Sequence, residues 1–63
     1  MRNDKYRIEA GGEVVWRGSV PPSDEVVNAV ARNASREGWN GTVLDLYFAG
    51  SFERELYPDF ELA

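Results

Sequence analysis

Apolar residues alternate with polar ones along most of the chain, and one central stretch breaks this alternation. Residues 4–10, 14–20, 42–48 and 52–57 place apolar side chains at about every second position, which is typical of half-buried β-strands. Residues 24–37 instead repeat apolar side chains at spacings of three and four, which predicts an amphipathic α-helix. The pattern predicts the order strand-strand-helix-strand-strand in a single domain that spans all 63 residues.

The predicted helix is bounded by residues that favour helix ends. Ser23 can cap the first turn with its hydroxyl, and Asp24 and Glu25 follow where the helix dipole favours negative charge. Gly38 stands where helices commonly end in a left-handed conformation. One stripe of the helix is apolar and should form a wall of the core: Val26, Val27, Val30, Ala31 and Ala34.

The first two strands form a predicted hairpin around a Gly-Gly dipeptide. A two-residue turn at this dipeptide would mix apolar and polar side chains on each face of the hairpin, whereas register follows the hydrophobic pattern. We therefore expect a three-residue loop at residues 11–13. This loop pairs Ile8 with Trp16 and Ala10 with Val14.

The order of the elements predicts an α+β fold of the ββαββ type. A right-handed crossover through the helix can place the third strand parallel to the first, which gives a four-stranded mixed sheet with one helix packed on one face. Residues 20–25 (Val-Pro-Pro-Ser-Asp-Glu) lead into the helix, and residues 46–50 (Leu-Tyr-Phe-Ala-Gly) end the third strand. In these segments the chain resembles the ubiquitin-like β-grasp arrangement, and the resemblance implies a β-grasp-like topology and no function.

The residue types needed for common catalytic and metal sites are scarce. The chain contains no His and no Cys, so it lacks the commonest general base and the thiolate ligand of many metal sites. Glu53 and Glu55 share one strand face, but alternating acids on an edge strand are better explained as protection against aggregation. Asp59 and Glu61 supply too few oxygens for Ca²⁺. We therefore expect no enzyme, no cofactor and no metal.

The chain also lacks the features of a membrane or secreted protein. No apolar run approaches the roughly 20 residues of a membrane span, and the N-terminal residues do not form a signal peptide. The expected location is the cytoplasm, which for a viral protein would be the host cytoplasm. By analogy, an acidic domain of this size suits a phage-type or accessory protein.

Charge is distributed unevenly along the chain, whose net charge is −4. Residues 1–36 carry six basic against five acidic side chains, whereas residues 37–63 carry one basic against six acidic side chains. This acidic C-terminal block favours a basic partner or simply keeps the domain in solution. It disfavours nucleic acid, because phosphate groups attract Lys and Arg.

One helix can cover only one face of the sheet, so the other face should lie open. In the last strand, alternation predicts Phe52 and Leu56 on the core side. The open face should include apolar and aromatic side chains, which mark interfaces when they are adjacent. Together with Trp39 in the loop after the helix, they give these candidate partner-binding residues: Val15, Arg17, Trp39, Val43, Tyr47, Glu53, Glu55 and Tyr57.

These features favour a non-catalytic protein-protein interaction domain, an adaptor or inhibitor, that uses the open face and the acidic block. A homodimer through the same face is a version of this hypothesis, and oligomerisation is a known remedy for so short a chain. Two alternatives remain. The sheet-face aromatics could stack the bases of a single-stranded nucleic acid, or the acidic block could mimic nucleic acid in a partner's groove.

Overall fold

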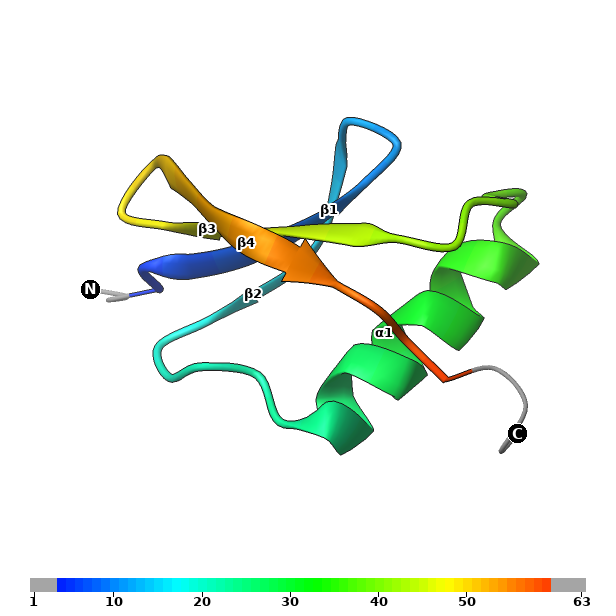
Figure 1. Cartoon of the computed structure of the whole chain (residues 1–63), viewed down its shortest axis with the longest axis horizontal. Helices are drawn as coiled ribbons and strands as arrows, with labels where there is room; N and C mark the ends of the chain where they lie inside the picture. Colours follow the sequence, from blue (N-terminus) through cyan, green and yellow to red (C-terminus); the bar gives the residue numbers. More distant parts are fainter. Residues whose placement is uncertain (1–3, 60–63) are drawn as a thin grey trace.

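The computed structural model describes residues 4–59, in which one helix packs against a four-stranded sheet (Figure 1). The elements are β1 (Tyr6–Ala10), β2 (Glu13–Gly18), α1 (Asp24–Arg36), β3 (Leu44–Phe48) and β4 (Ser51–Leu56). Each element lies within two residues of its predicted bounds. The predicted α+β class and the ββαββ order are therefore confirmed.

The prediction of a mixed sheet is wrong. The strand order is β2-β1-β3-β4, and every neighbouring pair is antiparallel. The 13 residues of α1 rise about 20 Å, which matches the length of a six-residue strand, so the helix returns the chain to the end where β2 began. Because β3 then runs in the direction of β2, it is antiparallel to β1, which lies between them. The β-grasp-like parallel pairing of the first and third strands is absent.

The residues at the start of α1 behave as the sequence predicts. The Ser23 hydroxyl accepts a hydrogen bond from the Val26 backbone N–H at 3.3 Å, and Asp24 and Glu25 occupy the first turn. Asp59 lies beyond β4, and its backbone N–H donates to Asn28 Oδ1 at 2.8 Å. Residues 57–59, which follow β4, therefore lie beside α1 (Figure 1).

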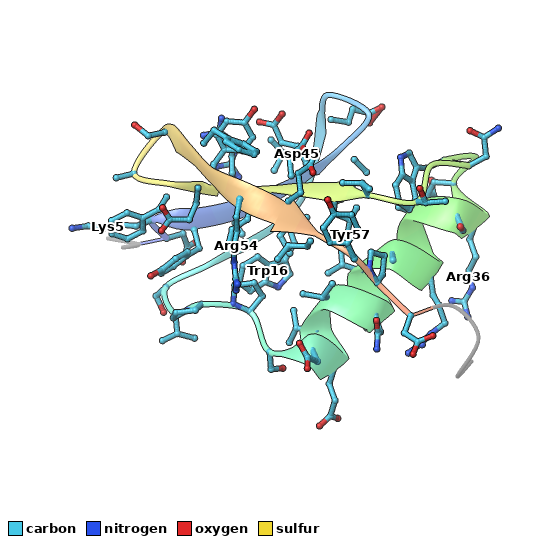
Figure 2. All side chains as sticks on the ribbon, viewed as in Figure 1. Lys5, Trp16, Arg36, Asp45, Arg54 and Tyr57 are labelled. Carbon is cyan, nitrogen blue, oxygen red and sulfur yellow. The ribbon has the colours of Figure 1, made fainter. Side chains whose placement is uncertain are left out.

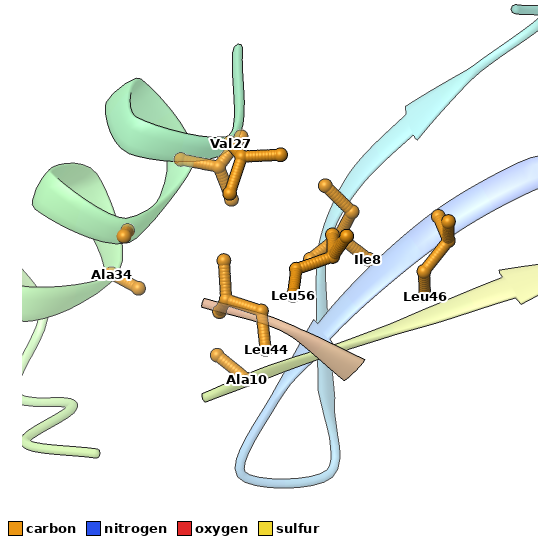
Figure 3. Close-up of a cluster of buried hydrophobic side chains, with 9 residues drawn as sticks. Ile8, Ala10, Val27, Ala34, Leu44, Leu46 and Leu56 are labelled. Carbon is orange, nitrogen blue, oxygen red and sulfur yellow. The ribbon is translucent and has the colours of Figure 1, made fainter. Parts of the chain in front are cut away.

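The core fills the space between the helix and one face of the sheet (Figure 3). The predicted helix stripe contributes four buried side chains, and Val26 packs against their edge. Buried polar or charged side chains are absent from residues 4–59, so burial of apolar surface stabilises the packing of the helix on the sheet. The core residues are Ile8, Ala10, Val27, Val30, Ala31, Ala34, Leu44, Leu46 and Leu56.

Both hairpins are built in the same way. Each has a two-residue turn with positive φ at both positions, 60° and 87° at residues 11–12 and 52° and 86° at residues 49–50. Such turns match the natural twist of the flanking strands. Each second strand then carries one extra residue, Val15 in β2 and Glu53 in β4, at a β-bulge. The two bulges follow their turns at the same distance, three residues after the second turn residue.

Because of the turn length and the first bulge, the register of the β1–β2 hairpin differs in part from the predicted one. The turn has two residues, not three, so Ala10 pairs with Glu13 and not with Val14. The extra residue then shifts the register, and Ile8 pairs with Trp16 as predicted. Val14 therefore lies opposite Glu9 and is 41% exposed.

The second bulge moves Phe52 to the face opposite the helix. Alternation places Phe52 and Leu56 on one face, but Glu53 interrupts the alternation, so only Leu56 is buried. Phe52 pairs with Tyr47 and is 54% exposed. The prediction that Phe52 faces the core is therefore wrong.

Within residues 4–59, α1 is too short and too polar to cross a membrane.

Candidate functional site

Four side chains form one row across the open face of the sheet, with one residue from each strand. Arg17 on β2 lies opposite Arg7 on β1, Arg7 lies opposite Tyr47 on β3, and Tyr47 lies opposite Phe52 on β4. Arg17 and Phe52 are exposed, whereas Arg7 and Tyr47 are half-buried. We call these four residues the arginine–aromatic row.

Contacts between neighbours hold the centre of the row in place. The Arg7 guanidinium carbon lies 4.2 Å from the centre of the Tyr47 ring, a cation–π contact. The Phe52 ring meets the Tyr47 ring edge to face, with centres 5.8 Å apart. Arg7 Nε also donates to Glu9 Oε2 at 2.7 Å. Because these contacts fix Arg7 and both rings before a partner arrives, binding would cost less side-chain entropy.

A second row lies beside the first and is acidic. Glu9 lies opposite Val14 on one side and Asp45 on the other, and Asp45 lies opposite Glu55. Figure 2 shows Asp45 on the opposite side of the sheet from Trp16 and Arg54. Like charges directly opposite each other destabilise a sheet. We define the acidic row as Val14, Glu9, Asp45 and Glu55. A positive charge from a binding partner would therefore reduce the repulsion between its carboxylates.

Tyr57 lies just beyond the end of β4 and is attached to the acidic row. Its hydroxyl donates to Glu55 Oε1 at 2.6 Å, and its side chain is 70% exposed. The hydrogen bond to Glu55 raises the pKa of Tyr57 above 10.0, and the negative charge of Glu55 adds to the effect. Tyr57 thus carries its proton at neutral pH and stays a donor.

Four of the predicted partner-binding residues lie away from the two rows. Val15 is the bulge residue of β2 and packs against the core, and Trp39 also packs against the core. Val43 is half-buried and precedes β3, and Glu53 is the bulge residue of β4. The structure therefore brings Arg17, Tyr47 and Glu55 onto the open face, with Tyr57 beside them.

The acidic C-terminal block is not one surface. Glu37 lies at the end of α1, whereas Asp45 and Glu55 lie on the open face of the sheet. Asp59 lies near the first half of the helix, where it bonds to Asn28. Glu61 lies outside the described residues. Only part of the block is therefore placed beside the arginine–aromatic row.

Trp39 forms a wall of a separate cleft between the β1–β2 hairpin and the C-terminal end of α1. The cleft has a volume of about 580 Å³. The lining residues are Ala10, Gly11, Glu13, Val14, Val15, Asn33, Ala34, Glu37, Gly38 and Trp39. It lies apart from the arginine–aromatic row, none of whose members lines it.

Within residues 4–59, no group of three or more acidic side chains is arranged to hold a metal ion. No protein-family model matches the chain, and neither a curated protein nor a solved structure is significantly similar to it.

Sequence reasoning missed Phe52 and Val14 as members of the open face. The signal that could have placed Val14 is the turn sequence, because Gly-Gly favours a two-residue turn. Such a turn agrees with the apolar pattern of residues 4–20 only if the second strand contains one extra residue, so the first bulge could have been inferred from this conflict. The second turn gives no such signal, because Ala49 disfavours the positive φ that it adopts there.

Proposed function

We propose that this chain is a small non-catalytic domain that binds another protein through the open face of its sheet. The observation that supports the proposal is the arginine–aromatic row, which aligns two guanidinium groups and two aromatic rings across all four strands. Arg and Tyr are enriched among the residues that dominate binding energy at interfaces. A single exposed apolar side chain would not indicate a binding surface, since such side chains are normal on protein surfaces.

The acidic row indicates the charge of the partner. Glu9 is already paired with Arg7, whereas Asp45 and Glu55 lie opposite each other with the same charge. A Lys or Arg side chain from a partner would remove this repulsion and would also increase the rate of association. We therefore propose a partner that presents apolar surface to Tyr47 and Phe52, with a basic group beside it.

Single-stranded nucleic acid is a second candidate ligand of the arginine–aromatic row, because aromatic rings next to arginines can stack bases. The neighbouring negative charges make nucleic acid the less well supported ligand. Glu9, Asp45 and Glu55 lie beside the two arginines and would repel the phosphate backbone. A titration with a single-stranded oligonucleotide at low salt separates the two candidates, and we expect no binding.

An acidic mimic of nucleic acid is supported least, because two arginines lie beside the carboxylates on this face. A homodimer through the open face stays a prediction, as does the cytoplasmic location.

The test is a comparison of two substitutions at the centre of the row. The partner is first captured from a lysate of the source cells with the tagged wild-type domain, and its affinity is then measured by calorimetry. We expect Tyr47→Ala to weaken binding by about thirtyfold, the effect of losing one hot-spot residue of about 2 kcal/mol. Tyr47→Phe keeps the ring and should bind nearly as well as the wild type. A folded Tyr47→Ala domain with unchanged affinity would contradict the proposal.

A further inference from the structure

The cleft beside Trp39 is a second surface with a definite shape and charge. Its volume of about 580 Å³ falls within the range of ligand pockets, roughly 300–1,000 Å³. Its walls come from two separate parts of the fold, the β1–β2 hairpin and the C-terminal end of α1. This volume exceeds what a single ammonium ion needs, and it admits a long side chain together with some of its backbone.

The position of Trp39 follows from the way the helix ends. The Gly38 N–H donates to the Ser35 carbonyl at 3.1 Å, and the Trp39 N–H donates to the Ala34 carbonyl at 3.0 Å. With Gly38 at φ 106°, this is a Schellman motif, in which the residue after the glycine packs back on the last turn.

Two glycines then support the Trp39 ring. A Cβ atom added at Gly11 would lie 3.6 Å from Trp39 Cδ1, and one added at Gly41 would lie 2.7 Å from Trp39 Nε1. A side chain at position 41 would therefore clash with the ring, whereas a Cβ atom at position 11 would only be in ordinary van der Waals contact with it. Trp39 is therefore a fixed aromatic wall of the cleft.

The charged residues that line the cleft are both acidic. Within residues 4–59, Glu13 and Glu37 line it, and no Lys or Arg does. The C-terminal end of a helix adds the negative pole of the helix dipole. An anionic ligand would be repelled here, whereas a cation would be attracted. A metal ion is a poor occupant, because no three acidic residues within residues 4–59 are grouped to hold one.

We propose that this cleft binds a Lys or Arg side chain in a short peptide segment of a partner protein. The aliphatic stem of such a side chain would lie against Trp39 and the half-buried Val15, and its charged end would lie near Glu13 and Glu37. A cation beside an indole ring is the most favourable of the cation–π pairs. This site is separate from the arginine–aromatic row and does not depend on the function proposed for it.

The test is an NMR titration of the ¹⁵N-labelled domain with end-blocked tripeptides. The probes are Ala-Arg-Ala and Ala-Lys-Ala, with Ala-Gln-Ala as the neutral control of similar size. We expect the Arg and Lys peptides to shift the Trp39 indole N–H and the backbone amides of Gly11 and Gly38 in a saturable way. The Gln peptide should leave these signals unchanged.

Substitutions then show which acidic side chains contribute to binding of the Arg peptide. Glu13→Gln combined with Glu37→Gln should weaken binding of the Arg peptide by roughly fivefold or more, the loss expected from two partly exposed ion pairs. Asp24→Asn combined with Glu25→Gln is the matched control, because both residues are exposed acids at the other end of the same helix. It also removes two negative charges from the domain and should leave the affinity unchanged.

Three outcomes would overturn the proposal: equal shifts with the Gln peptide, equal weakening by the control substitutions at Asp24 and Glu25, or no saturable shift of the Trp39 indole signal. The titration is repeated on Asp45→Asn combined with Glu55→Gln, which neutralises the acidic row of the open face and leaves the residues that line the cleft unchanged. Retained binding of the Arg peptide by this variant separates the cleft from the function proposed for the sheet.

Discussion

Ala49 holds a backbone conformation that is unusual for a residue with a side chain. Its φ of 52° lies in the left-handed region, and its N–H donates to the Lys5 carbonyl at 2.8 Å. A left-handed conformation costs an L-residue roughly 1–2 kcal/mol. Gly or Asn would occupy this turn position with less strain, because both tolerate positive φ.

We therefore predict that Ala49→Asn raises the free energy of unfolding by about 0.5–1 kcal/mol, since Asn-Gly is a favoured sequence for this turn. In thermal unfolding followed by circular dichroism, the midpoint should rise by roughly 3–6 °C. The same substitution at the exposed helix residue Ala29 should lower the free energy of unfolding by about 0.5 kcal/mol, because Asn is a poorer helix former than Ala. A lower midpoint for Ala49→Asn would contradict the assigned turn.

At the scale of elements, α1 could be predicted closely because its signals are local. Ser23 caps the helix, the apolar spacing of its residues selects the buried stripe, and Gly38 ends it, all as the sequence indicates. The faces of β2 and β4 could be predicted only in part. Alternation assumes an uninterrupted strand, so a single extra residue at Val15 or Glu53 reverses the assignment of the residues between it and the turn.

The buried stripe of α1 gives a test of the core. Val30 lies in the middle of this stripe and is 9% exposed. Val30→Asp would place a carboxylate among aliphatic side chains at a cost of several kcal/mol, which is comparable to the whole stability of a small domain, about 5 kcal/mol. We predict that the variant is unfolded, with loss of the far-ultraviolet circular dichroism signal and of dispersion in the NMR spectrum.

The neighbouring residue provides the control for this substitution. Ala29 is exposed, so Ala29→Asp introduces the same carboxylate at an adjacent helix position without burying it. This variant should remain folded and lose only about 0.5 kcal/mol of stability. If Val30→Asp folded as well as Ala29→Asp, the assignment of the core would be wrong.

At the scale of the whole molecule, the helix divides the sheet into a covered face and an open face. That division could be predicted from the sequence, because one amphipathic helix cannot cover both faces. The arrangement of side chains on the open face could not, since it depends on pairing between strands that are far apart in the chain. Arg7 and Tyr47 are 40 residues apart, and only the antiparallel β1–β3 pairing brings them together.

The structure and simple alternation disagree most clearly on Phe52, which belongs to the arginine–aromatic row. Alternation places this ring in the core, whereas the bulge at Glu53 places it beside Tyr47, 54% exposed. Val20 is a suitable comparison, because it is a large apolar side chain that is 64% exposed and lies after the end of β2. Truncation of either side chain should change stability little, since both are largely exposed.

The most direct test of the account is therefore the affinity of the captured partner for Phe52→Ala and Val20→Ala, each measured by calorimetry on a folded domain. We predict that Phe52→Ala weakens binding by about tenfold or more, as expected for an aromatic residue at the edge of a hot spot. Val20→Ala should bind like the wild type. Wild-type affinity for Phe52→Ala would show that the arginine–aromatic row is not the binding surface.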